Sequence, residues 1–185
     1  LQGAYCAAKH AVKGFTQSLR TELLHDKSGI QVSMVELPAV NTPQFDWSRS
    51  RMPRRAQPVP PIFQPEVIAR AVVKTALEPR REKIVGWPAL KAIIAERISP
   101  AAGDWYLARN GFDAQMTDEP DDPDRPHNLW EPVPGAHGAH GAFDDRARER
   151  CPQLWMSKHR NWIALACLGL AGLACASQLG RPRTT

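Results

Sequence analysis

The segment Y-C-A-A-K, residues 5–9, carries two side chains that could transfer a proton together. Residues four apart on a helix lie on the same face, so Tyr5 and Lys9 are expected to project side by side. A lysine ammonium next to a tyrosine phenol favours the phenolate form, which makes a phenol able to give or take a proton near neutral pH. The pair alone could also be an ordinary exposed helix pair, because Y-x-x-x-K is common by chance.

The residues after this pair predict a helix and then a buried strand, which would position the pair. The helix pattern continues with apolar residues spaced by three and four, at Val12, Phe15, Leu19 and Leu23. The dipeptide Ser28-Gly29 interrupts it. The following run I-Q-V-S-M-V-E-L, residues 30–37, is typical of a buried strand, and it leads into P-A-V-N-T, residues 38–42.

Taken in order, these elements resemble the C-terminal half of a short-chain dehydrogenase/reductase domain. The resemblance rests on Y-x-x-x-K, on a helix with G-F-x-x-S-L-R-x-E-L and on a β-branched strand that ends in P-A-V-N-T, and it covers residues 1–110. It implies an α/β fold, the C-terminal part of a Rossmann-like doubly wound parallel sheet. The family's usual turn is P-G-x-x-x-T; here Ala39 replaces the Gly and Thr42 stands one place earlier.

The same resemblance implies a reaction and the residues that perform it. An NAD(P)-dependent oxidoreductase would interconvert a carbonyl and an alcohol, with Tyr5 as the acid/base and Lys9 assisting it and binding the nicotinamide ribose. The backbone of the turn would touch the carboxamide, with the Thr42 hydroxyl close to the cofactor. The residues expected to contact NAD or NADP are Tyr5, Lys9, Pro38, Ala39, Val40 and Thr42.

The segment from residue 43 to residue 65 is rich in Pro, Arg and aromatic residues, and in the family this region covers the substrate. Phe45, Trp47 and Phe63, together with Met52, could build a pocket for a small apolar substrate. Alternatively, the segment is a surface loop whose aromatic side chains pack on the edge of the sheet. Four arginines could steer an anion or remain in solvent, namely Arg49, Arg51, Arg54 and Arg55.

Some parts of the family's site have no counterpart in the sequence. No Gly-rich T-G-x-x-x-G-x-G turn is present, and the Gly-dense residues 135–141 follow a Pro-rich loop instead of a strand. The family's catalytic Ser would lie before Tyr5, outside the chain. We therefore expect a fragment that lacks the N-terminal cofactor-binding half and is catalytically incomplete as given.

Further along the chain, three regions are expected. Residues 1–110 would close the sheet domain with a helix from Pro65 to about residue 78, a strand at 83–87 and a helical stretch over 90–107 broken near Pro100. Residues 111–157 are rich in Pro and Asp and are expected to be an irregular extension. Its histidines include an H-x-x-H pair, but no ligand set is complete, so no metal site is predicted.

Residues 158–185 contain an apolar stretch, residues 162–179, that carries no charge and has basic flanks. A helix of this length would measure about 27 Å, which is near the thickness of a thin bilayer. The stretch therefore predicts a membrane anchor, with a buried helix at a dimer interface as the alternative. The protein is accordingly expected to be cytoplasmic or membrane-associated with its catalytic domain in the cytoplasm.

The formal net charge of +5 is modest and does not indicate a nucleic-acid partner. Two functions remain in view. The first is an oxidoreductase that acts on a small carbonyl or alcohol substrate and forms a homo-oligomer. The second is a non-catalytic, membrane-tethered binding or scaffold protein that retains the same fold.

Overall fold

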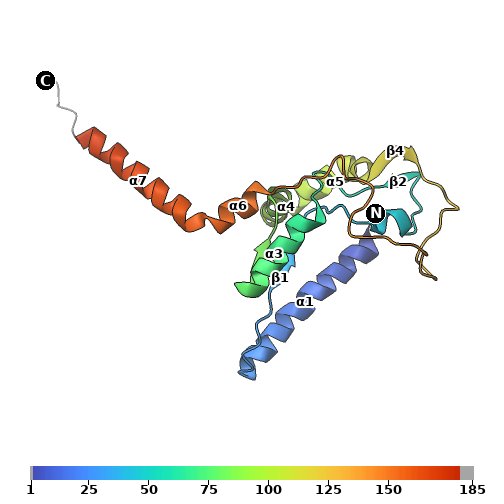
Figure 1. Ribbon diagram of the computed structural model, residues 1–185, viewed down its shortest axis with the longest axis horizontal. Coiled ribbons are helices and arrows are strands. Elements are labelled where there is room, and N and C mark those ends of the chain that lie inside the picture. Colours follow the sequence, from blue (N-terminus) through green and yellow to red (C-terminus); the bar gives the residue numbers. More distant parts are fainter. Residues whose placement is uncertain (1, 180–185) are drawn as a thin grey trace. The chain divides into compact units, whose positions relative to one another are not determined.

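The structure is a computed structural model that describes residues 2–179, and in the last helix the side chains up to Leu170 (Figure 1). The chain divides into two compact units, Leu1–Cys151 and Pro152–Thr185. The first unit contains all the strands and the elements that matter for the site. The extension up to residue 151 therefore belongs to the same unit as the sheet.

The first helix, α1 (Gly3–His25), is continuous through the predicted segment. Its sequence contains no Pro, and it ends where Lys27 adopts a positive φ of 52°. Ser28 closes the last turn, because both its backbone N–H and its hydroxyl donate to the carbonyl oxygen of Leu23. No residue of α1 is buried, so the apolar stripe of this helix remains largely exposed.

Two short strands form the parallel sheet that the sequence predicts. Strand β1 (Met34–Glu36) pairs with β3 (Glu82–Ile84), and Met34 lies opposite Glu82. Parallel neighbours need a crossover connection, and helix α3 (Pro65–Leu77) lies in that connection. The α/β class with parallel pairing is therefore confirmed, although each strand is shorter than its predicted segment.

A second pair of strands was not predicted from the sequence. Strand β2 (Arg54–Ala56) pairs antiparallel with β4 (Met116–Pro120), which lies in the extension. Arg54 and Arg55 form ion pairs across this sheet with Asp118 and Glu119, respectively. Arg54 also pairs with Asp113, which lies just before β4. Two of the four arginines thus pair with acidic residues of the extension, and the extension is not irregular throughout.

Helices connect and cover these strands. The short helix α2 (Gln44–Trp47) follows the P-A-V-N-T turn. The predicted break near Pro100 is confirmed, since α4 (Trp87–Ile98) ends at Ser99 and α5 (Pro100–Ala114) begins directly after it. The Ser99 hydroxyl accepts a hydrogen bond from the backbone N–H of Ala102 and so caps α5.

The core of the first unit forms around one face of α3. Pro65 and Glu66 occupy the first turn of this helix, where a proline and an acid are favoured. Residues from the segment before α3, from the strand region and from the extension complete the core. The buried apolar residues are Ile62, Phe63, Val67, Ile68, Ala71, Val85, Met116, Phe143 and Cys151.

The second unit consists of two helices, α6 (Pro152–Lys158) and α7 (Arg160–Leu179). In the part of the chain that the structure describes, no helix combines the length and the apolar character needed to cross a membrane. The predicted membrane anchor over residues 162–179 is therefore not supported. The portion of that anchor after Leu170 lies outside the described side chains.

Two valines of α3 provide a test of this core. Val67 is 1% exposed and Val73 is 59% exposed. We expect Val67→Ala to lower the free energy of unfolding by about 2 kcal/mol, because two methyl groups leave a packed interior. The same substitution at Val73 should cost less than about 0.5 kcal/mol. Chemical denaturation of both variants measures the difference, and equal losses would contradict the assigned buried face.

Candidate active site

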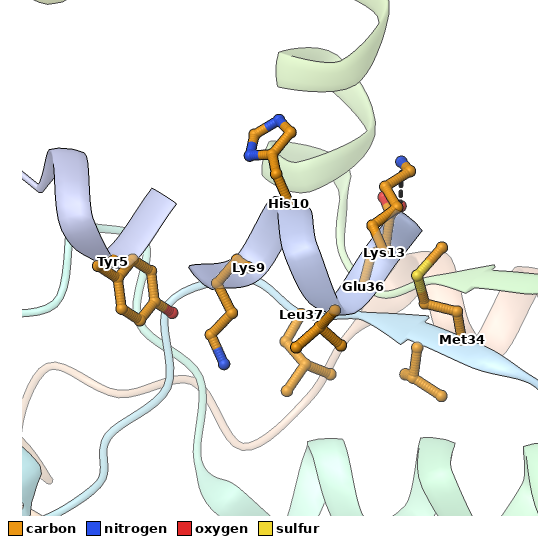
Figure 2. Close-up of a pocket in the computed structure, with 9 residues that line it drawn as sticks. Tyr5, Lys9, His10, Lys13, Met34, Glu36 and Leu37 are labelled. Carbon is orange, nitrogen blue, oxygen red and sulfur yellow. Dashed lines mark hydrogen bonds and ion pairs between the residues drawn. The ribbon is translucent and has the colours of Figure 1, made fainter. Parts of the chain in front are cut away.

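A cavity of about 420 Å³ lies between α1 and β1 (Figure 2). Helix α1 contributes polar and charged side chains, whereas the strand contributes a largely apolar wall. The lining residues from α1 are Tyr5, Lys9, His10, Val12 and Lys13. Those from the strand segment are Met34, Val35, Glu36 and Leu37.

Tyr5 and Lys9 lie on the same side of α1, as Figure 2 shows. The ammonium nitrogen of Lys9 is 5.3 Å from the centroid of the Tyr5 ring, within the range of a cation–π contact. The Tyr5 side chain is accessible, since the residue is 56% exposed. The spacing of four residues therefore brings the two groups together at an open face of the cavity.

His10 points to the other side of α1 in Figure 2. Its Nδ1 lies 2.9 Å from the carbonyl oxygen of Cys6 on the same helix.

Lys9 has no carboxylate within ion-pair distance among the residues whose side chains the structure describes. The positive charge of Lys9 is thus available to a bound group.

An ion pair fastens α1 to β1 beside the cavity. Lys13 Nζ donates to Glu36 Oε1 at 3.0 Å. Farther along α1, the Arg20 guanidinium donates to the carbonyl oxygens of Val32 and Arg81. The sequence analysis did not identify Lys13 and Glu36. Two signals could have done so: Lys13 follows Lys9 by four residues, and Glu36 is the charged residue of an otherwise apolar strand.

The P-A-V-N-T turn leaves β1 and is fixed by the segment before α3. The backbone N–H of Asn41 donates to the Phe63 carbonyl oxygen, and the Phe63 N–H donates to the Ala39 carbonyl oxygen, both at 2.9 Å. The Asn41 side chain is fully buried. The Thr42 hydroxyl forms no hydrogen bond with any residue that the structure describes, and so it can serve a ligand.

The three residues predicted to bind substrate do not line this cavity. Phe63 is 3% exposed and lies in the core. Phe45 contacts Phe143 edge-on with ring centroids 6.1 Å apart, and Trp47 contacts His137 edge-on at 4.1 Å. Both aromatic side chains of α2 are therefore packed against residues of the extension.

The side chain of Arg125, which lies in the extension, binds backbone carbonyl groups at the end of α2. Its Nη1 donates to the Asp46 carbonyl oxygen at 2.8 Å, and its Nη2 donates to the Ser48 carbonyl oxygen. Asp121 accepts from its Nε at 3.1 Å, which keeps the guanidinium oriented. The end of α2 is thus tied down at its unsatisfied carbonyl groups, a role that the sequence alone did not reveal.

A second polar cluster lies at the start of α3, next to the turn. His140 Nε2 is 2.8 Å from Glu66 Oε1, and His140 Nδ1 is 2.7 Å from Asp144 Oδ1. The hydrogen bond to Glu66, followed by that to Asp144, raises the pKa of His140 above its ordinary value. His137, the other histidine of the H-x-x-H pair, instead bonds to the Val133 carbonyl oxygen. Among the described residues, no three His, Cys, Asp or Glu side chains are arranged to hold a metal ion.

Comparisons with known proteins place these residues in a wider context. Residues 1–52 match a family model described as short chain dehydrogenase. The chain is 25% identical over 138 residues to the uncharacterized oxidoreductase YxnA of Bacillus subtilis (strain 168), a match that covers 74% of this chain and 39% of that protein. The chain thus spans about two fifths of the length of that relative. No solved structure matches the chain.

The contacts of Arg125 predict that α2 is held by this side chain. Arg125→Ala should increase amide hydrogen exchange in residues 44–48, because several backbone carbonyl groups lose a charged donor. Arg125→Lys should restore part of the protection, since an ammonium can serve fewer carbonyl groups than a guanidinium. Arg49→Ala, at an exposed arginine beside α2, is the control and should leave exchange unchanged. Unchanged exchange in Arg125→Ala would refute the assigned contact.

Proposed function

Because residues 1–52 match the short chain dehydrogenase family model, we propose that the chain carries the acid–base pair of an NAD(P)-dependent oxidoreductase that interconverts a carbonyl and an alcohol. One observation carries the proposal. Tyr5 and Lys9 lie on one side of α1 and line the same cavity, opposite an apolar strand. A proton donor and a cation beside an apolar wall suit a reaction in which a hydride and a proton reach a carbonyl group.

The cavity supports a nicotinamide group on chemical grounds. Met34, Val35 and Leu37 offer apolar surface to a flat ring, and the cavity is large enough for a group of that size. The Thr42 hydroxyl, which is without a hydrogen bond among the described residues, could serve the carboxamide. Lys9 has donors for the ribose hydroxyl groups.

Residues of this chain would transfer the proton. A bound nicotinamide supplies or accepts the hydride. The Tyr5 hydroxyl would give a proton to the substrate oxygen during reduction or take it during oxidation. The Lys9 ammonium, which lies 5.3 Å from the centroid of the Tyr5 ring, would stabilise the negative charge that develops on the phenol oxygen.

The ion pair between Lys13 and Glu36 supports this division of roles. This ion pair fixes α1 against β1 and neutralises the charge of Lys13. Lys9, which has no such partner among the described residues, keeps its charge for a ligand. The turn that binds the cofactor pyrophosphate would be provided by residues other than these, because the chain contains no Gly-rich phosphate turn. The same holds for the catalytic Ser of the family's site. We propose a small apolar carbonyl compound or alcohol as substrate.

Substitution of the tyrosine tests the chemistry in the complete gene product. Tyr5→Phe removes the transferable proton and keeps the ring, so turnover of a carbonyl panel with NADH or NADPH should fall about 10²–10⁴-fold while cofactor binding survives. Lys9→Ala should weaken cofactor binding as well. Steady-state rates and cofactor fluorescence titration measure the two effects separately.

The chain offers a matched control, because its other tyrosine, Tyr106, is exposed on α5. Tyr106→Phe makes the same chemical change outside the cavity and should leave turnover unaltered. If Tyr5→Phe retains near-normal turnover of a substrate that the parent protein reduces, the role assigned to Tyr5 is wrong.

A further inference from the structure

Residues 140–148 of the extension lie against the P-A-V-N-T turn. The backbone N–H of Gly141 donates to the Asn41 carbonyl oxygen at 3.4 Å, and the N–H of Phe143 donates to Asn41 Oδ1 at 3.1 Å. The approach is close, because a Cβ atom on Gly141 would lie 2.5 Å from the Thr42 carbonyl oxygen. Only a residue without a side chain fits this place.

The buried Asn41 amide depends on this segment. Asn41 Nδ2 donates to Asp144 Oδ1 at 2.8 Å and to Gln64 Oε1 at 3.2 Å. Gln64 Nε2 also donates to Asp144 Oδ1, at 2.9 Å. Since a buried amide without partners is unfavourable, removal of residues 140–148 from the turn would cost the Asn41 side chain two of its partners, the Phe143 N–H and Asp144 Oδ1.

His140 connects this segment to α3. Its two ring nitrogens face two carboxylates, Glu66 on α3 and Asp144 on its own segment. A neutral imidazole has one N–H donor, whereas the protonated ring has two. An ionised carboxylate only accepts hydrogen bonds, so the bridge needs the protonated form of His140 to be complete.

We propose that residues 140–148 form a strap that positions the P-A-V-N-T turn, and that His140 is a pH-sensitive latch that fastens this strap to α3. Asn41 and Asp144 are the positioning residues of the strap. With His140 protonated, the strap is held at both carboxylates. With His140 neutral, one of its two hydrogen bonds to the carboxylates is lost, and residues 140–148 separate from the turn more often.

The charges around the latch determine its pH range. Glu66 and Arg70 face it from α3, and Asp144 faces it from the strap. The pKa of His140 is raised by its hydrogen bonds to Glu66 and Asp144. The stability that His140 adds to the strap is therefore fully present below about pH 6.5 and is lost as the pH rises through the raised pKa. The hydrogen bond from His140 lowers the pKa of Glu66. The pKa of Asp144 is also lowered, chiefly by the hydrogen bond from Gln64. The contribution of the carboxylates is lost as the pH falls through those lowered values, and the strap is therefore tightest in mildly acidic solution.

Any effect of the strap on cofactor binding rests on the proposed function, because only that function makes the turn a contact of the carboxamide. The existence of the strap does not rest on the proposed function. It can be measured without cofactor or substrate, so its failure and the failure of the proposed chemistry are separate results.

Hydrogen exchange of the whole chain tests the strap. Exchange of residues 41–42 and 141–148 should be measured at about pH 5.5 and about pH 8.5, on either side of the imidazole range, and divided by the intrinsic exchange rate at each pH. We expect protection to be about two- to fivefold lower at the higher pH, the size that an exposed ion pair supports. His140→Gln should abolish this pH difference and show the lower protection at both pH values.

The control is His137→Gln, because His137 lies in the same region but bonds to a backbone carbonyl group. It should keep the pH difference. A parent chain with pH-independent protection, or a His140→Gln variant that keeps the difference, would overturn the latch.

The positioning role of the strap is tested by a steric change that carries no charge. Gly141→Ala should raise exchange of residues 41–42 at both pH values, since the added methyl group meets the Thr42 backbone. Ala142→Ser, at the next and exposed residue, should have no such effect. Unchanged exchange in Gly141→Ala would show that the strap does not position the turn.

Discussion

The buried side chain of Asn41 is the constraint on which the arrangement of the first unit depends. It belongs to the turn after β1, and its hydrogen-bond partners come from two other segments, the residues just before α3 and the extension. A buried amide needs these partners, so the three segments must be in place together. The position of the turn, which follows directly after the apolar wall of the cavity, is thereby linked to a part of the chain more than one hundred residues away.

Helix α1 is held in a different way. It buries none of its residues, and its recorded links to the strand region are polar: the ion pair of Lys13 with Glu36 and the hydrogen bonds of Arg20. Exposed apolar residues on this helix, such as Val12 and Phe15, contribute little to its attachment. Charged groups therefore help to hold the wall of the cavity that carries Tyr5 and Lys9.

The sequence predicted the features that leave a local or periodic pattern. The spacing of Tyr5 and Lys9 and the break before Pro100 follow from neighbours a few residues apart. The parallel pairing of β1 and β3 was expected from the family resemblance and not from a local pattern. The pairing of β2 with β4 and the contacts of Arg125 join residues far apart in the chain. Such contacts depend on where the chain returns in space, and no periodicity records them. The extension was therefore expected to be irregular, although it supplies Met116 and Phe143 to the core.

The return of the extension also changes what the aromatic residues after the turn can do. Phe63 is enclosed by the core, and Phe45 and Trp47 pack against Phe143 and His137. Their apolar surface is thus used to join α2 to the extension. Because Arg125 fixes the backbone of the same helix, α2 is held by aromatic packing on its side chains and by charged hydrogen bonds at its carboxyl end. In the described part of the chain, the apolar surface opposite Tyr5 and Lys9 in the cavity is that of Met34, Val35 and Leu37, which belong to β1 and the residue after it.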